Sequence, residues 1–199
     1  MKNQLKAGIL LSYATTGISI FIQLVYMPVM IRLLGQSEFG LYSLVSGVVS
    51  YLSLFSLGFT GAYLRFFARE NQKNDREGLA ALNGMFILLF LLLSCAALIC
   101  GFTLSCFPRQ IFGTKLSGAE LQEARILMMI LVVNTAICLV SGIFDSIVSA
   151  YEQFVFQRVV SLAATVMNPF LCLPLLLLGY GNVMLVVVST CIVVGKLAI

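Results

Sequence analysis

The chain has 199 residues, of which 60% are hydrophobic and only 10% are charged, and its mean hydropathy is +1.04. A soluble domain of this length cannot bury so much apolar surface, so the composition indicates an integral membrane protein. Histidine is absent, the six cysteines form no Cys-x-x-Cys motif, and the net charge of +4 is not gathered in a long basic cluster. These features argue against a metal site, a cofactor, a histidine-based enzyme, a disulfide framework and a nucleic-acid partner.

Several apolar runs exceed the length of about 18 residues that a membrane-spanning helix needs, and none shows the alternation of an outer-membrane β-barrel strand. We therefore predict an all-α, polytopic membrane protein with six transmembrane helices. The helices are expected at residues 7–33, 40–64, 79–107, 120–150, 154–178 and 183–199. The basic start of the chain resembles that of a signal peptide, but the apolar run that follows is too long for one.

A short polar turn joins the first two predicted helices. Gly35 can adopt the left-handed conformation that ends a helix, Ser37 can cap the next helix, and Glu38 suits its first turn. Arg32 lies just inside the preceding apolar run, where a cation needs an ionic partner, a wet cavity or the membrane interface. Pro28 is expected to kink the first helix.

Two capping-box patterns, Asn74-x-x-Glu77 and Ser117-x-x-Glu120, predict the starts of the third and fourth helices. Pro169 and Pro174 interrupt the fifth. Lysine and arginine residues number eight on the side of the N-terminus and four on the other side. By the positive-inside rule, the N-terminus is expected in the cytoplasm.

Four predicted helices carry polar residues at intervals of three or four, so that each has one polar face. The faces comprise Ser12, Thr15, Thr16, Ser19, Gln23 and Tyr26 on the first helix, Ser43, Ser46, Gly47 and Ser50 on the second, Asn134, Cys138, Ser141, Asp145 and Ser149 on the fourth, and Gln157, Ser161, Thr165 and Asn168 on the fifth. The small residues of the second helix favour tight helix packing. The larger polar groups of the other three favour a water-accessible central cavity.

Two charged residues have alternative interpretations. Asp145 lies near the end of the fourth helix and could pair with Arg158 or hold an ion, and the structural pairing is favoured. Arg65 ends the second helix, where it could anchor the helix at the cytoplasmic surface or contact a substrate. The residues alone leave both roles of Arg65 open.

Three sequence patterns resemble those of the bacterial polysaccharide-biosynthesis flippases, in the multidrug/oligosaccharidyl-lipid/polysaccharide (MATE-like) exporter superfamily. The patterns are Arg32-Leu-Leu-Gly-x-x-Glu-Phe-Gly-Leu-Tyr-Ser-Leu44, Leu57-Gly58 followed by Arg65-Phe66, and Ala150-Tyr-Glu-Gln-Phe-Val-Phe-Gln-Arg158. The resemblance covers essentially the whole chain, in the order of the first six helices of that family.

The resemblance implies a transporter of two six-helix lobes that alternates between inward-open and outward-open states. Its substrate would be an undecaprenyl-diphosphate-linked oligosaccharide, moved across the bacterial cytoplasmic membrane in cooperation with a polysaccharide polymerase or assembly proteins. Cations would bind the diphosphate, and amides would bind the sugar. The candidate binding residues are Arg32, Arg65, Gln23, Asn134 and Asn168, and Asp145 is the candidate for ion coupling.

Two departures from the family pattern matter. The chain has no counterpart of the second lobe, so residues 1–199 are expected to be the N-terminal lobe of a longer protein. The first helix lacks the carboxylate that related multidrug antiporters often carry, which disfavours the alternative of a cation-coupled multidrug exporter. A membrane-embedded glycan-processing enzyme is a further alternative, although the membrane region offers Asp145 and no histidine for catalysis. We predict no enzymatic activity, and a non-transporting scaffold is the last alternative.

Overall fold

The computed structural model describes residues 2–56, 58–72, 76–108, 110, 118–151, 153–178 and 181–198. Its elements are α1 Lys2–Leu34, α2 Gln36–Ser50, the 3-10 helix η1 Tyr51–Ser56, α3 Phe59–Gln72, α4 Arg76–Cys106, α6 Gly118–Ala150, α7 Phe154–Leu177 and α8 Asn182–Ala198. No strand occurs among the described residues. The predicted all-α fold class is confirmed.

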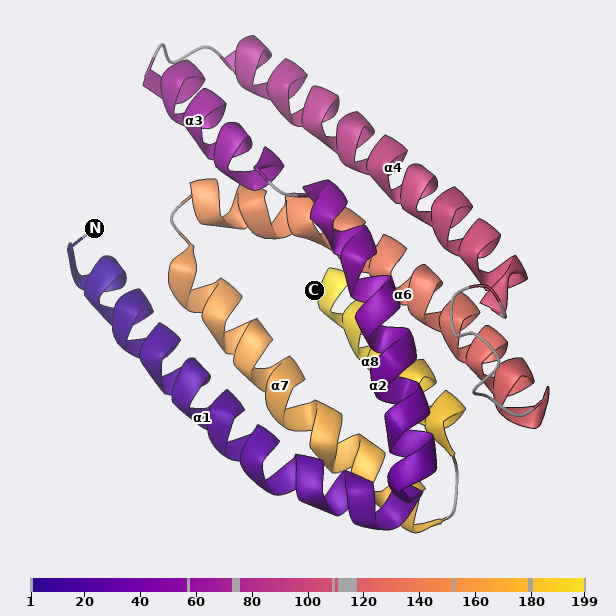
Figure 1. Cartoon of the computed structure of the whole chain (residues 1–199). Helices are drawn as coiled ribbons and strands as arrows, with labels where there is room; N and C mark the ends of the chain where they lie inside the picture. The colour runs from indigo at the N-terminus through magenta and orange to yellow at the C-terminus, as the bar shows by residue number, and fades with distance from the viewer. Residues whose placement is uncertain are drawn as a thin grey trace.

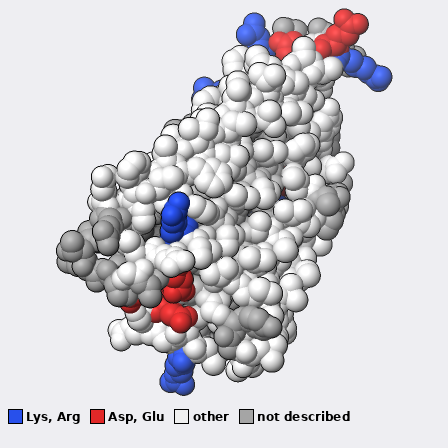
Figure 2. Space-filling view, turned by 90° about the vertical axis from the view of Figure 1, so that its right-hand side faces the viewer, with Lys and Arg blue, Asp and Glu red and all other residues white. Residues whose placement is uncertain are grey.

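Among the described residues, five helical stretches are long and apolar enough to cross a membrane, so the chain is a multi-pass membrane protein. They are Leu11–Leu34, Gln36–Gln72, Arg76–Cys106, Glu120–Ala150 and Val155–Leu177. The helix α8 is apolar but shorter, so the sixth span stays a prediction. Figure 2 shows most charged side chains gathered toward the two ends of one face of the molecule, with a broad uncharged surface between them.

The long helices lie alongside one another in a bundle (Figure 1). The helix α4 packs on α6, α1 packs along α7, and α8 lies in the middle, in contact with α6, α7 and α2. The main buried cluster joins α2, α4, α6 and α8 through residues such as Val45, Ala97, Leu127 and Val186. The bundle therefore places α8 against both α6 and α7.

The predicted second helix, residues 40–64, is not one helix. It is divided into α2, η1 and α3, and Gly58 at the start of α3 has a φ of 84°. The hydroxyls of Ser50, Ser53 and Ser56 each donate to the backbone carbonyl three residues earlier, at 2.7, 2.6 and 2.8 Å. Such local hydrogen bonds compete with regular α-helical pairing, and Gly58 readily adopts the positive φ that changes the direction of the chain.

The polar face of α2 was expected to pack tightly, but among the described residues only Ser46 of this face is half-buried. The buried residues of α2 are its apolar ones, Leu41, Val45 and Val49. In contrast, Ser43, Gly47 and Ser50 are exposed, and a side chain at Gly47 would meet open space. Branched and bulky residues repeated every four positions bury more area against α6 than the small residues can.

The turn between α1 and α2 consists of Gly35 alone. Its φ of 84° and ψ of 159° lie in a region that only glycine adopts readily. This confirms Gly35 as the turn residue but not Ser37 as the cap, since α2 begins at Gln36 and no side chain caps it. Instead, Ser37 Oγ donates to Glu120 Oε1 at 3.1 Å and joins α2 to α6.

Substituting Gly35 with alanine is expected to lower the free energy of unfolding by roughly 1–2 kcal/mol, because a Cβ strains this backbone conformation. Thermal unfolding of the purified chain in detergent measures the effect. Gly40→Ala in α2 is the control, since Gly40 has no positive φ and a Cβ there meets open space. Equal melting temperatures for the two variants would contradict the strained-turn explanation.

The other predicted helices agree with the structure to within a few residues, except that α1 begins at Lys2, five residues before the expected position 7. Pro28 lies inside α1, whose ribbon curves (Figure 1). The first residues of the two capping boxes, Asn74 and Ser117, lie outside the described residues.

Candidate functional site

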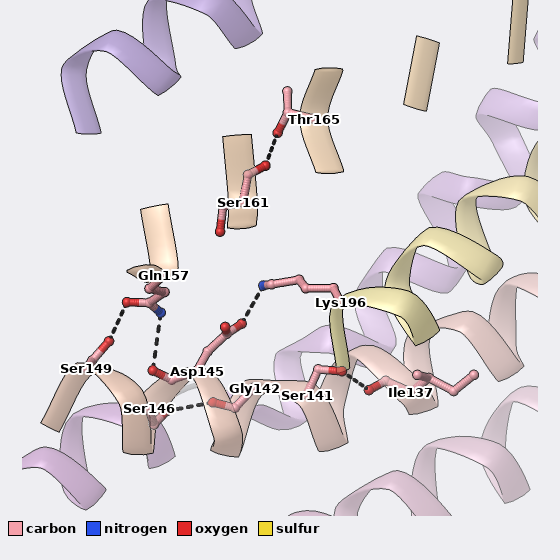
Figure 3. A network of polar contacts seen from close by, with 10 residues as sticks. All are labelled: Ile137, Ser141, Gly142, Asp145, Ser146, Ser149, Gln157, Ser161, Thr165 and Lys196. Atoms are coloured by element: carbon pink, nitrogen blue, oxygen red, sulfur yellow. Dashed lines mark hydrogen bonds and ion pairs between the residues drawn. The ribbon is translucent and has the colours of Figure 1, made fainter. Parts of the chain in front are cut away.

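The polar faces of α6 and α7 meet where α6 ends and α7 begins (Figure 3). The connection between these helices is short, so residues near their joined ends face one another. Ser149 Oγ donates to Gln157 Oε1 at 2.8 Å, and Gln157 Nε2 donates to the backbone carbonyl of Asp145 at 3.2 Å. Both ends of the Gln157 amide are thus paired, as a polar group at membrane depth requires.

An ion pair joins the same place to α8. Lys196 Nζ lies 2.7 Å from Asp145 Oδ2, and the two side chains are only 26% and 36% exposed. The expected partner of Asp145, Arg158, is not the one in the structure: it is exposed, and its neighbour Gln157 is the α7 residue that faces α6. The α8 helix runs back beside α6, and this brings Lys196 within reach.

A cavity of about 270 Å³ opens beside this ion pair. It lies between α6, α7 and α8, and its lining comprises Ser141, Phe144, Asp145, Val148, Phe156, Gln157, Val160, Lys196 and Leu197. A carboxylate, an ammonium, an amide and a hydroxyl therefore surround one space together with aromatic and aliphatic side chains. Such a space can hold water or the polar part of a ligand.

The two candidate asparagines lie along the same helices. Asn134 Nδ2 donates to Thr190 Oγ1 at 3.0 Å, and Asn168 Nδ2 donates to Ser189 Oγ at 3.2 Å. Both partners are consecutive residues of α8, so Asn134 and Asn168 bond to α8 at the same level, from α6 and from α7. Each makes a hydrogen bond between helices, which is the packing role that polar residues often have in membranes.

The candidate residues of α1 lie elsewhere. Gln23 and Arg32 are exposed and line a surface groove whose described residues all belong to α1. The half-buried residues of α1 include Ser12, Ser19 and Tyr26. A central cavity shared by the first, fourth and fifth helices was predicted. Among the described residues, α8 and not α1 lines the cavity together with α6 and α7. The reason is that α1 packs on the side of α7.

Arg65 also lies apart from the cavity. It is exposed on α3, beside a space of about 530 Å³ that Gly58, Gly61, Ala62, Phe66 and Arg69 also line. The five candidate binding residues thus occupy three places: the exposed face of α1, the exposed face of α3, and the contacts of α6 and α7 with α8. Within the described residues they do not converge on a single site.

A family model described as polysaccharide biosynthesis protein matches residues 5–198. The chain belongs to this family. No curated protein and no solved structure matches the chain significantly.

In this member of the polysaccharide biosynthesis family, none of the predicted site residues lies on α8, although α8 supplies polar contacts to α6 and α7. The partners of Asn168, Asn134 and Asp145 on α8 are Ser189, Thr190 and Lys196, respectively. From the sequence, Lys196 was considered only as a positive charge near the end of a helix. Ser189 and Lys196 are seven residues apart and so share one helix face. That spacing was the available signal for a polar face on α8.

A second set of polar contacts lies at the other end of α8, away from Lys196. The fully buried Asn182 donates through Nδ2 to the backbone carbonyl of Glu38 at 2.9 Å and to Glu123 Oε1 at 3.4 Å. The start of α8 is thus joined to the starts of α2 and α6. Across the described part of the chain, no group of three or more acidic or cysteine residues is arranged to hold a metal ion.

Proposed function

We propose that the chain translocates undecaprenyl-diphosphate-linked oligosaccharides across the bacterial cytoplasmic membrane for the assembly of a surface polysaccharide. The observation that carries this proposal is a charged, hydrogen-bonded cavity between α6, α7 and α8, found in a multi-pass member of a polysaccharide biosynthesis family. Placing a charged side chain at membrane depth costs free energy, and charged residues found there often line the pathway of a polar substrate.

We further propose that these helices form one lobe of a two-lobed, MATE-like transporter with its N-terminus in the cytoplasm. Exposed polar residues support the presence of a second lobe. Gln23 on α1 and Ser43 and Ser50 on α2 face outward inside apolar helices. Contact with lipid is unfavourable for an amide, so a second lobe that covers these faces would stabilise them.

In this proposal, the cations hold the diphosphate and the amides hold the sugar. Arg65 and Arg32 are the candidates for the diphosphate because both are exposed. Asn134 and Asn168 would contact the sugar by replacing their hydrogen bonds to α8 with hydrogen bonds to the sugar. Asp145 would take part in ion coupling only when it separates from Lys196, because the two charges neutralise each other in the pair.

The proposal is tested in a strain that lacks the gene. Expression of the full-length gene should restore surface polymer and should leave resistance to toxic drugs unchanged. Restored resistance without polymer would favour the multidrug exporter instead. A covalent change in the lipid-linked glycan that requires the purified protein would favour the enzyme.

The variant Arg65→Ala is expected to reduce surface polymer per molecule of protein by roughly tenfold, the effect of losing one charge-assisted hydrogen bond to phosphate. Immunoblots measure the abundance of the protein, and a polymer-specific stain measures export. Arg158→Ala is the matched control, since Arg158 is another exposed arginine on the side predicted to be cytoplasmic. Parent-level export in Arg65→Ala would remove Arg65 from the proposed route.

A further inference from the structure

An apolar groove of about 530 Å³ runs between α7 and α8. Its lining extends on α7 from Val159 to Leu175, about 24 Å of helix at the usual rise per residue. The groove is thus nearly as long as the hydrocarbon core of a bilayer is thick, about 30 Å. Val159, Met167 and Leu171 in its wall are exposed, so lipid tails can enter the groove from the side.

The groove and the polar cavity meet at Lys196. Lys196 and Val160 line both spaces, so one elongated apolar surface leads to a small polar space with an ammonium group at the junction. The ammonium has three hydrogen-bond donors, and the structure shows one side-chain acceptor for it, Asp145 Oδ2. An anionic group with several oxygens can therefore bind the same nitrogen.

We infer that this junction binds the polyprenyl diphosphate part of the substrate. The isoprenoid tail lies in the groove between α7 and α8, and the diphosphate binds Lys196. Asp145 is the competing acceptor that holds Lys196 while the site is empty. This inference rests on the proposed function, and it adds a location for the lipid tail and a residue that opposes binding.

The direction of the groove suits a lipid of the cytoplasmic leaflet. Lys196 lies near the end of α8, on the side that the charge count predicts to be cytoplasmic, and the groove leads from there toward Met184 and Leu175. A diphosphate at Lys196 would thus lie near the cytoplasmic surface with its tail in the membrane core. The adjoining polar cavity, with Gln157 and Ser141, lies beside the head group, where the first sugar would be.

The test is binding of geranylgeranyl diphosphate to the purified chain in detergent, measured by titration calorimetry. Lys196→Gln should weaken binding by roughly 10-fold to 100-fold, the effect of losing a charged hydrogen bond, whereas Asp145→Asn should strengthen it several-fold. A pair with only a structural role would not give opposite signs. Gly195→Leu fills the groove beside Lys196 and should also weaken binding, while Gly84→Leu on α4 is its control, because a side chain meets open space at both glycines.

Four results would overturn the inference: unchanged binding in Lys196→Gln, weaker binding in Asp145→Asn, equal binding of inorganic diphosphate, or equal competition by phosphatidylglycerol. If Lys196→Gln does not fold, the double variant Asp145→Asn/Lys196→Gln keeps the pair neutral and should bind as weakly. The proposed function is judged separately by surface polymer. Polymer export that continues in variants without binding removes this site alone, and binding in a protein that exports no polymer removes the function alone.

Discussion

Replacing Gly101 with valine is expected to lower the free energy of unfolding by about 3 kcal/mol, because α4 and α6 leave no room for a side chain there. A Cβ built on Gly101 would lie 3.0 Å from Cβ of Val132 and closer still to both methyl groups of that residue. Gly101 is buried, and Val132 is 1% exposed. Neither residue can turn away without separating the helices.

The close approach at Gly101 also permits a hydrogen bond between the helices. Ser94 Oγ on α4 donates to the backbone carbonyl of Ala136 on α6 at 3.0 Å, and this serine is buried. Helices in a membrane associate through such packing and hydrogen bonds, because lipid supplies no hydrophobic drive between them. A side chain at Gly101 therefore disturbs both kinds of contact.

Unfolding of the purified chain in mixed micelles with increasing sodium dodecyl sulfate measures this effect. Gly84→Val on the same helix is the control, because a side chain there meets open space and valine favours the helix slightly over glycine. Adding Val132→Ala to Gly101→Ala should recover part of the stability lost in Gly101→Ala alone. Parent-like stability of Gly101→Val would show that the helices can separate at little cost.

Hydropathy predicted the helices well, because each apolar run must be long enough to cross the bilayer and must pair its own backbone groups. It could not predict the break formed by residues 51–56 and Gly58. That break depends on serine hydroxyls that donate hydrogen bonds to nearby backbone carbonyls and on a positive φ at Gly58. Both are local features within an apolar stretch. Hydropathy averaged over a window of many residues does not detect such local features.

The candidate site was predicted in part. Three- and four-residue spacing identified the polar faces of α6 and α7, because residues on one helix face must share a neighbour. The identity of that neighbour depends on how distant helices pack. Asp145 was predicted to form an ion pair with Arg158, which is close to it in the sequence. In the structure, the packing of α8 on α6 brings Lys196 to Asp145 instead. Gln23 and Arg65 lie apart from the cavity for the same kind of reason, because α1 packs on α7 and α3 packs on α4 and α6.

Neutralising both members of the Asp145–Lys196 pair is expected to remove most export while the abundance of the protein stays near that of the parent. The double variant Asp145→Asn/Lys196→Gln leaves no unpaired charge among the helices, whereas either single change leaves one. It also removes the ammonium proposed to bind the diphosphate. The loss of a charged hydrogen bond, about 1.5–3 kcal/mol, corresponds to a fall in export of roughly 10-fold to 100-fold.

Surface polymer per molecule of protein in the complemented deletion strain measures this loss. The matched control is the double variant Tyr63→Phe/Asn83→Leu, which removes a 2.7 Å hydrogen bond between Tyr63 and Asn83 on α3 and α4. That control tests whether any lost polar pair in the bundle impairs export. If the control exports normally and the neutralised pair does not, the charges of the Asp145–Lys196 pair are needed for transport beyond their part in holding α6 to α8. Equal export in both double variants would make the ion pair purely structural.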